Sequence, residues 1–367
     1  MRRQQPPGAR RCDDRRVRST GPIARVASVF TTPRAPEDFI WLVNPLSSAR
    51  QLRGVVTAVV PETPDSATIH FRPGRGWQAH QAGQYARIGV EIDGVRHWRS
   101  YSLSTPGGAD PAITVTANGQ VSEALVRCTR PGHVLFLAPP QGDFVLPEHP
   151  RPLLMLTAGS GLTPVMSMVR TLVRRRSDAD VVLVHSSRTL DDALFREELA
   201  ALGDEHPALR VVHWVTSDRG RIDLDRTDDL DTVVPDWRSR AAYVCGPPEM
   251  LDAATALWQS ANVPGQLSVE RFAPVLLDGA GGEGGLVTFE TSDREVEVDG
   301  STPILEAGED AGVVMPSGCR MGICQSCLIP LLAGQVRDLR TGEVHGDEGQ
   351  LIQTCVSAAA GPVHLEI

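Results

Sequence analysis

The sequence has 367 residues, a hydrophobic content of 41 % and a formal net charge of −9 at pH 7. A chain of this length can hold two or three domains with separate cores, which excludes a single small domain. No apolar run approaches the roughly 20 residues of a membrane span, which excludes a membrane-spanning protein, and we expect no nucleic-acid partner.

The first 49 residues are predicted to form a tail and a segment that precedes the first domain. Residues 1–20 carry seven arginines and few apolar side chains, which predicts disorder, and no hydrophobic segment follows to make them a signal peptide. Residues 39–43 form one apolar run. We expect this run to pack on the first domain, and contact with a partner or a membrane surface is the alternative.

Residues 50–150 alternate apolar and polar side chains in short segments that glycine and proline separate. Several short strands at such a spacing predict a small antiparallel β-barrel. The expected strands are residues 54–60, 67–71, 85–90, 100–104, 113–116 and 133–137.

Residues 151–272 show a different pattern, in which buried strands alternate with helices. This order predicts an α/β domain with a parallel sheet that binds its ligand at the carboxyl ends of the strands. Strands are expected at residues 153–157, 181–184, 210–215 and 241–245, and helices at 165–176, 193–202 and 249–260.

Residues 273–285 are rich in glycine and predict a flexible linker to a last domain over residues 286–367. That domain has 13 acids against four arginines, a balance of −9 that equals the net charge of the whole chain. An acidic face would steer it toward a partner with a basic docking surface, and solubility alone is the alternative explanation. A hairpin at 287–298, a helix at 304–311 and a final strand at 363–367 are expected.

Four cysteines of the last domain predict a metal centre. Cys319, Cys324 and Cys327 have four and then two residues between them, and Cys355 follows at a distance, which is the spacing of plant-type 2Fe-2S ferredoxins. A structural zinc site usually has two close pairs of cysteines, and only Cys324 and Cys327 form such a pair. We therefore predict that these four thiolates hold a 2Fe-2S cluster.

The remaining cysteines indicate the compartment. They are Cys12, Cys128 and Cys245, an odd number that argues against the disulfide framework of a secreted protein. We expect a cytoplasmic protein.

Four further motifs occur in a fixed order. They are Arg-x-Tyr-Ser at 99–102, Gly-x-x-Ser at 119–122, Gly-Ser-Gly-Leu-Thr-Pro at 159–164 and Cys-Gly-Pro-Pro at 245–248. Each alone could be an ordinary strand, turn or loop. Together they resemble the ferredoxin-NADP reductase superfamily across residues 50–272. With a plant-type ferredoxin behind them, the chain resembles the single-chain flavin reductases that supply oxygenases and desaturases.

This resemblance implies an FAD site on the barrel. Arg99 would bind the FAD pyrophosphate, Tyr101 would stack on the isoalloxazine, and Ser102 would lie near flavin N5, where hydride arrives. The backbone amides from Gly119 to Ser122, at the start of a helix beginning at Ser122, would also bind the pyrophosphate. The last domain would be an α+β ferredoxin of the β-grasp type.

The resemblance also implies a nicotinamide site on the parallel sheet. Gly159 and Gly161 would let the dinucleotide approach the backbone, and Thr163 and Pro164 would begin a helix whose N-terminus faces the pyrophosphate.

The hydride-transfer pocket would lie between the two sites. Cys245 would lie beside the nicotinamide, and Gly246 and Pro247 would shape the wall. The alternative for Cys245 is a small buried apolar residue at the end of a strand. Phe272 would cover the flavin face that the nicotinamide must reach, and Glu270 would complete the pocket. Ser102 is the third residue expected to be catalytic.

The residues after strand 181–184 bear on the choice of cofactor. Ser187 and Arg188 can receive a 2′-phosphate, and the next acid is Asp191, which favours NADPH over NADH. The sequence contains no lysine, so Arg188 would have to supply the positive charge.

The implied function is electron transfer. NAD(P)H would give a hydride to FAD, and single electrons would pass through the cluster to an outside acceptor. Residues 37–46 and 52–54 resemble actinobacterial reductases of membrane acyl-chain desaturases, the acceptor expected first, with which the protein could associate peripherally at a membrane. The alternatives are a soluble ring-hydroxylating or diiron monooxygenase, or a redox sensor, against which Glu270, Cys245 and the glycine turn argue.

Overall fold

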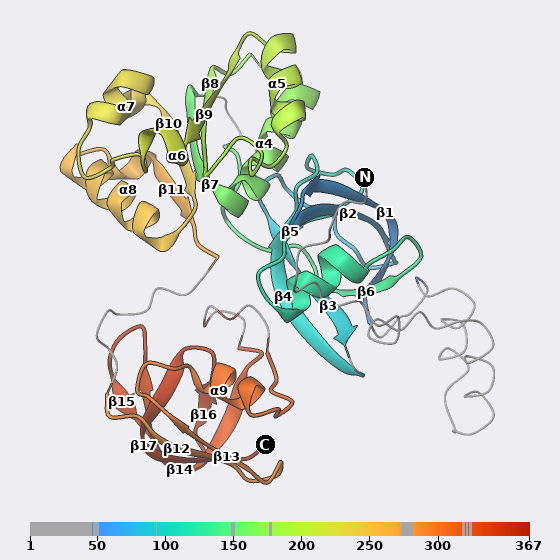
Figure 1. Ribbon diagram of the computed structural model, residues 1–367, viewed down its shortest axis with the longest axis vertical. Helices are drawn as coiled ribbons and strands as arrows, with labels where there is room; N and C mark the ends of the chain where they lie inside the picture. Colours follow the sequence, from blue (N-terminus) through green and yellow to red (C-terminus); the bar gives the residue numbers. More distant parts are fainter. Residues whose placement is uncertain are drawn as a thin grey trace, which may run out of the picture.

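A computed structural model describes residues 46, 51–92, 94–147, 151–175, 178–272, 282–317, 320, 322 and 325–367. The expectations for residues 1–45, including the apolar run at 39–43, and for the linker at 273–281 lie outside these residues. The described chain folds into three lobes in sequence order, each built on its own sheet (Figure 1). No helix in this part of the chain is both long and apolar enough to cross a bilayer.

The first lobe is an antiparallel six-stranded sheet in the order β4-β3-β6-β1-β2-β5. A bridge between Leu103 and Ile113 joins the two ends of this order, so the sheet closes around its apolar core as a barrel. The strands are β1 (Arg53–Thr63), β2 (Ser66–Pro73), β3 (Tyr85–Ile92), β4 (Val95–Ser102), β5 (Ala112–Thr116) and β6 (Val134–Leu137).

One helical segment interrupts the barrel between β5 and β6. It consists of α3 (Gln120–Glu123) and η3 (Ala124–Cys128), and Val121 and Leu125 pack it onto the barrel core. The helix therefore begins at Gln120, two residues before the expected Ser122. Apolar Val121 favours the earlier start because its side chain is buried only when the first turn already faces the barrel.

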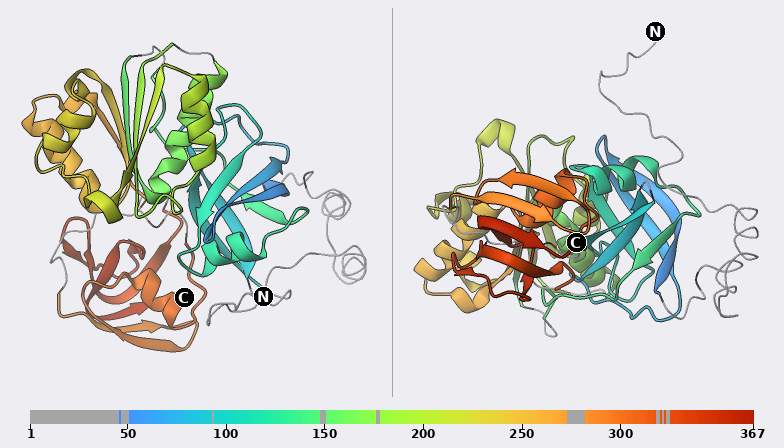
Figure 2. Two further views of the ribbon diagram at one scale, coloured as in Figure 1. Left: turned by 45° about the horizontal axis from the view of Figure 1, so that its top comes forward. Right: turned by 90° about the horizontal axis from the view of Figure 1, so that it is seen from below.

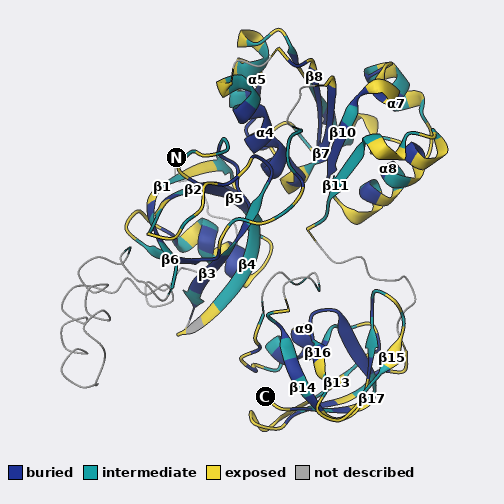
Figure 3. Ribbon diagram, turned by 180° about the vertical axis from the view of Figure 1, so that it is seen from behind, coloured by how far each residue is buried: buried dark blue, intermediate teal, exposed yellow. Residues whose placement is uncertain are grey.

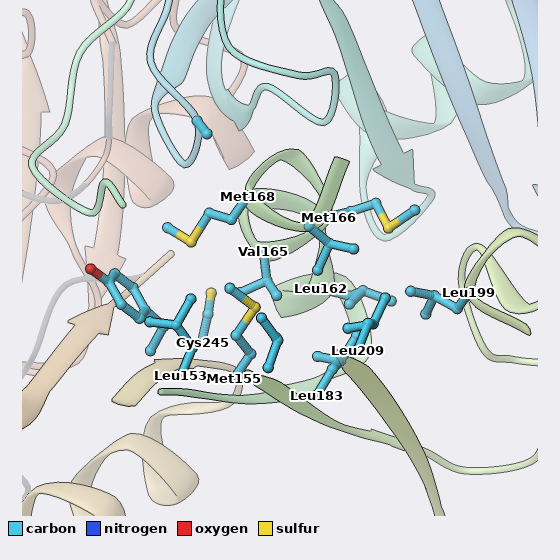
Figure 4. Packing of buried hydrophobic residues seen from close by; sticks show 14 of the residues in the cluster. Leu153, Met155, Leu162, Val165, Met166, Met168, Leu183, Leu199, Leu209 and Cys245 are labelled. Atoms are coloured by element: carbon cyan, nitrogen blue, oxygen red, sulfur yellow. The ribbon is translucent and has the colours of Figure 1, made fainter. Parts of the chain in front are cut away.

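The second lobe is a parallel five-stranded sheet in the order β11-β10-β7-β8-β9. Side chains of alternate residues enter opposite cores: Leu153 and Met155 pack under α4, and Leu154 and Leu156 pack under α8. Figure 3 shows the central strands of this sheet buried and the outer faces of the helices exposed. Figure 4 shows the first of these two cores.

The elements of this lobe follow the predicted alternation. The strands are β7 (Leu153–Ala158), β8 (Val181–Ser187), β9 (Leu209–Val215), β10 (Ala241–Cys245) and β11 (Leu267–Glu270). The helical segments are η4 (Gly159–Gly161), α4 (Leu162–Arg174), α5 (Arg196–Glu205), α6 (Thr216–Arg219), α7 (Asp228–Val233), η5 (Trp237–Ser239), α8 (Pro248–Ser260) and η6 (Pro264–Gln266).

The third lobe is a mixed sheet in the order β13-β12-β17-β14-β15, with β16 paired to β14 and one helix, α9 (Ile304–Asp310), packed beside it. This α+β arrangement agrees with the predicted fold class. Strand β12 already begins at Gly285, inside the expected linker. The strands are β12 (Gly285–Phe289), β13 (Arg294–Val298), β14 (Leu328–Asp338), β15 (Val344–His345), β16 (Leu351–Gln353) and β17 (Ser357–Leu365).

Candidate functional site

A cavity of about 380 Å³ opens between the barrel and the parallel sheet, and we call it the barrel cavity. Strand β4 supplies one wall, and the loop before α3 supplies another. Seven residues predicted from the sequence line it: Arg99, Tyr101, Ser102, Gly119, Ser122, Thr163 and Phe272. The structure thus brings together side chains from three motifs that are far apart in the sequence.

A second cavity, of about 300 Å³, lies at the carboxyl end of the parallel sheet, and we call it the turn cavity. It is lined by Gly159, Gly161, Gly246 and Pro247, which the sequence also predicted. Ser160 and Phe272 line both the turn cavity and the barrel cavity. The side chain of Phe272, which is 44 % exposed, therefore separates the two cavities.

A third cavity, of about 660 Å³, continues along the same edge of the sheet, and we call it the edge cavity. It shares Ala158, Gly159 and Pro247 with the turn cavity, and Ser187 and Arg188 line its far part. The three cavities therefore form one row from the edge of the sheet to the barrel.

Arg221 and Thr216 also line the edge cavity, and the sequence analysis missed them. They follow strand β9, which runs parallel to β8, so their segment leaves the sheet beside Arg188. The signal was present in the sequence, because an arginine-rich segment directly after a neighbouring parallel strand reaches the same sheet edge.

The two glycines of the turn after β7 have different roles. Gly159 has a φ of 53°, and nothing lies within 4 Å of the position its Cβ would take. A Cβ on Gly161 would lie 2.1 Å from the carbonyl oxygen of Cys245. Gly161 is therefore required by the close approach of strand β10, in addition to any approach of a ligand. The Thr163 hydroxyl donates to the Ser160 carbonyl at 2.9 Å, and Pro164 is buried in the first turn of α4.

The charges of the barrel cavity are partly shielded from water. Burial lowers the pKa of Arg99, and the positive charge of Arg320 lowers it further. Arg99 Nη1 donates to the Trp98 carbonyl at 2.9 Å, and its Nη2 lies 3.9 Å from Glu309 Oε1. Burial also raises the pKa of Tyr101, which keeps the phenol neutral beside this arginine.

Ser122 organises the loop before α3. Its hydroxyl donates to Asn118 Oδ1 at 2.9 Å and accepts the Asn118 backbone amide at 3.0 Å. These bonds close the turn around Gly119, whose φ of 170° is extended. The turn presents the start of the helix to the barrel cavity.

Cys245 lies in the core, as the alternative for this residue, a small buried side chain at the end of a strand, expects. Its side chain is completely buried among Met155, Val165 and their neighbours (Figure 4), and none of the three cavities, as the described residues line them, includes it. Burial, and then the charge of Glu270, raise the pKa of the thiol. The alternation of side chains along β10 explains this burial, since it turns Cys245 toward α4.

Glu270 lies level with Cys245 on the neighbouring parallel strand β11. Burial, and then the charge of Asp143, raise the pKa of its carboxyl to about 7. Glu270 does not line the three cavities, but it immediately precedes the segment of Phe272. The carboxyl of Glu270 can therefore hold a proton near neutral pH, two positions before Phe272 in the chain.

Two of the four predicted cluster ligands are described. The sulfur atoms of Cys327 and Cys355 are 3.3 Å apart, and Cys355 lowers the pKa of Cys327 to about 6, which favours the thiolate that binds metal. Cys319 and Cys324 lie outside the described residues. Among the residues the structure describes, no three metal-ligating side chains gather, so the site would be completed by those two cysteines.

The loop around these cysteines is held by its own lobe. Arg340 Nη1 and Gln353 Nε2 donate to the Gly322 carbonyl at 3.2 and 3.0 Å, and Asp338 fixes the Arg340 guanidinium. Gly322 has a φ of 70°, and a Cβ there would meet Arg340 at 2.6 Å. A glycine is therefore required at this position.

The segment from Cys319 to Cys327, which we call the cysteine loop, also contacts the barrel. Arg87 Nη1, on β3, donates to Ser326 Oγ at 2.6 Å, and Arg320 lines the barrel cavity. Both views in Figure 2 show the third lobe beside the barrel. The row of cavities therefore ends at the loop that carries the predicted cluster ligands.

Two known protein domains match parts of this chain. Residues 155–256 match the oxidoreductase NAD-binding domain, and residues 287–360 match the 2Fe-2S iron-sulfur cluster binding domain. The chain is 48 % identical to an NADPH oxidoreductase of Mycobacterium tuberculosis over 94 % of this chain and 92 % of that protein.

Two further proteins share most of the chain. The ferredoxin reductase component of 3-ketosteroid-9-alpha-monooxygenase from Rhodococcus rhodochrous is 30 % identical, over 77 % of this chain and 86 % of its own. The structure of phthalate dioxygenase reductase superposes with a TM-score of 0.61 at 22 % identity, covering 87 % of this chain and 98 % of that one. The second comparison supports the three-lobed fold.

Proposed function

Because the chain belongs to the ferredoxin-NADP reductase superfamily, in the group that ends in a 2Fe-2S domain, we propose that it is the NADPH-dependent reductase component of an oxygenase system. One observation carries this proposal. The edge cavity shares lining residues with the turn cavity, and the turn cavity shares lining residues with the barrel cavity. Arg320 of the cysteine loop also lines the barrel cavity.

The residues of the barrel cavity fit FAD. Arg99 offers a guanidinium for phosphate oxygens, the turn around Gly119 offers backbone amides, and Tyr101 offers a neutral ring for stacking. Bound FAD supplies the conversion between the two-electron hydride of a nicotinamide and the single electrons that a 2Fe-2S cluster accepts. Ser102 is 5 % exposed on the same wall and would orient the flavin through its hydroxyl.

The residues of the other two cavities fit NADPH. In the edge cavity, Arg188 and Arg221 offer two guanidinium groups to a 2′-phosphate, and Ser187 and Thr216 offer hydroxyls. Acids are present too, since Asp223 lines the cavity, but the two arginines favour NADPH over NADH.

Phe272 and Glu270 would control the junction of the cavities. The Phe272 ring would exclude water from the barrel cavity and move aside when nicotinamide enters. Glu270, whose carboxyl has a pKa of about 7, would hold a proton on the strand that leads to this ring. Cys245 would shape the junction through its carbonyl against Gly161, while its thiol stays in the core.

The acceptor is proposed from the relatives. The Rhodococcus protein is named as a component of a monooxygenase, and the fold is that of a dioxygenase reductase. These names favour a soluble oxygenase over the membrane acyl-chain desaturase that the sequence analysis placed first. The excess of acids in the third lobe would suit a partner with a basic surface, and salt would then weaken the coupling.

Substitution of one cluster ligand tests the proposal. Cys324→Ser should retain bleaching of the flavin by NADPH and lose the reduction of a one-electron acceptor such as cytochrome c. Undiminished cytochrome c reduction by the variant would remove the cluster from the path. Cys245→Ser is a matched control outside the cluster, and it should keep the visible absorbance of the cluster.

A further inference from the structure

A residue of the third lobe, which matches the 2Fe-2S domain and which we call the 2Fe-2S lobe, reaches the barrel cavity. Arg320 lies in the cysteine loop, yet its side chain lines this cavity with Arg99 and Tyr101. The other described residues that line it come from the barrel, the start of α4 and its turn, and Phe272. Arg320 also has a φ of 58°, a backbone conformation that residues other than glycine rarely adopt.

The charges around Arg320 leave room for an anion. Arg320 Nη2 pairs with Glu309 Oε1, and the same oxygen lies 3.9 Å from Arg99 Nη2. One carboxylate therefore contacts two guanidinium groups, and the negative charge of Glu306 also acts on Arg99. The repulsion between the two guanidinium groups contributes to the lowered pKa of Arg99. The Nε of Arg320 is buried and has no hydrogen-bond partner among the described residues. A buried donor without an acceptor is costly, and phosphate oxygens would satisfy it.

We infer that Arg320 is a second phosphate ligand of FAD, supplied to the barrel by the 2Fe-2S lobe. This inference rests on the proposed function, because it requires that the barrel cavity receives FAD. Arg99 and Arg320 bind the pyrophosphate from two lobes, and Glu309 balances the remaining positive charge. The FAD site is complete only when the cysteine loop lies against the barrel.

One consequence is a thermodynamic link between FAD and the docked lobe. A ligand that is bound by both lobes favours their contact by the same factor by which the contact favours the ligand. The bond from Arg87 to Ser326 holds the loop in place from outside the cavity, since Arg87 does not line it. Weakening this bond therefore weakens FAD binding without touching the FAD site.

Equilibrium binding to the flavin-depleted, cluster-containing full chain tests the inference, with FAD and riboflavin as the two probes. Riboflavin has no phosphate, so it reports on the ring site alone. Arg320→Ala is expected to weaken FAD about tenfold to a hundredfold, as for the loss of a charged hydrogen bond, and to leave riboflavin unchanged. Arg320→Lys should recover part of the loss. Arg294→Ala, which removes an exposed arginine of the same lobe, should change neither probe.

Three results would overturn the inference. FAD binding to Arg320→Ala equal to wild type would do so, as would equal weakening of FAD and riboflavin, which would indicate a change of cavity shape. If Arg320→Ala loses the cluster, Arg87→Ala decides: FAD should weaken several-fold with riboflavin unchanged, and unaltered FAD binding is the third contrary result. Failure of the wild-type chain to bind FAD would instead contradict the proposed function itself.

Discussion

Arginine side chains stand at both ends of the row of cavities, and burial distinguishes the two ends. In the barrel cavity, the side chains of Arg99 and Arg320 are 25 % and 22 % exposed and share one carboxylate. In the edge cavity, Arg188 and Arg221 are exposed. The same guanidinium group interacts strongly where water is excluded and weakly, with screening by salt, where it is not. The buried end is suited to hold a resident cofactor, and the exposed end to exchange a substrate.

The largest effect should come from the buried end. Arg99→Ala is expected to weaken FAD binding by about a hundredfold to a thousandfold, because it removes a charged partner from a partly desolvated site. Fluorescence titration at low and high salt would measure it, and the loss should persist in high salt. Arg96→Ala removes an arginine from the same strand that pairs with Glu91 outside the cavity, and it should bind FAD normally. A normal affinity for FAD in Arg99→Ala would contradict the claim that the buried arginines hold the resident cofactor.

The two glycines of the turn after β7 also differ in burial: a Cβ on Gly161 would meet the backbone of Cys245, and a Cβ on Gly159 would meet open space. Gly161→Ala would place a Cβ 2.1 Å from the Cys245 carbonyl and should lower the free energy of unfolding by about 2 to 3 kcal/mol. Gly159→Ala meets open space and should cost about 1 kcal/mol, from its φ of 53° alone. Urea denaturation of the two variants checks the order. Equal losses would show that the approach of β10 is not what requires Gly161.

The exposed end should give a smaller effect that salt weakens. Arg188→Ala or Arg221→Ala is expected to raise the KM for NADPH about tenfold at low salt and to leave the KM for NADH unchanged. Steady-state kinetics with both nucleotides measures this. Arg219→Ala is the control, because Arg219 packs over Trp214 in the same segment and does not line the edge cavity. A parallel rise for NADH would argue against a 2′-phosphate contact.

The last prediction concerns Glu270, where burial acts on an acid. Its pKa is about 7 in the folded chain against an ordinary value of 4.5, so the folded state holds a proton that the unfolded state releases between these values. Stability from this proton is complete below pH 4.5 and is lost as the pH rises to about 7. Glu270→Gln should remove this slope from the pH dependence of the thermal midpoint. An unchanged pH dependence of the thermal midpoint would show that the carboxyl of Glu270 is exposed to water and not buried.

Much of this architecture follows from local pattern. The strand expected at residues 241–245 is β10 to the residue, and the alternation of strands and helices gave the parallel sheet, because buried strands carry an apolar signal on both faces. Strand β14 was not expected. Pro330 and Gly334 interrupt its pattern, and the pairing with β17 shifts register at Gly334, so its sequence does not read as a continuous strand.

The site was predictable where motifs are local and not where lobes meet. Arg99, Tyr101 and the glycine turn belong to short motifs that fix their own geometry. The contact between Arg87 and Ser326 joins residues that are 239 positions apart, and no periodicity reports such a pair. Cys245 shows what a motif leaves open: both a ligand contact and a buried position were expected from it, and the side-chain direction on β10 places the thiol in the core.

Anaerobic stopped-flow mixing of the complete, cofactor-loaded protein with NADPH, and separately with NADH, tests the central claim most directly. We predict fast bleaching of the flavin with NADPH, slower bleaching with NADH, and reduction of the cluster only after the flavin has responded. Absence of flavin bleaching with either nucleotide would contradict the account and would favour a redox sensor that has no turnover of its own.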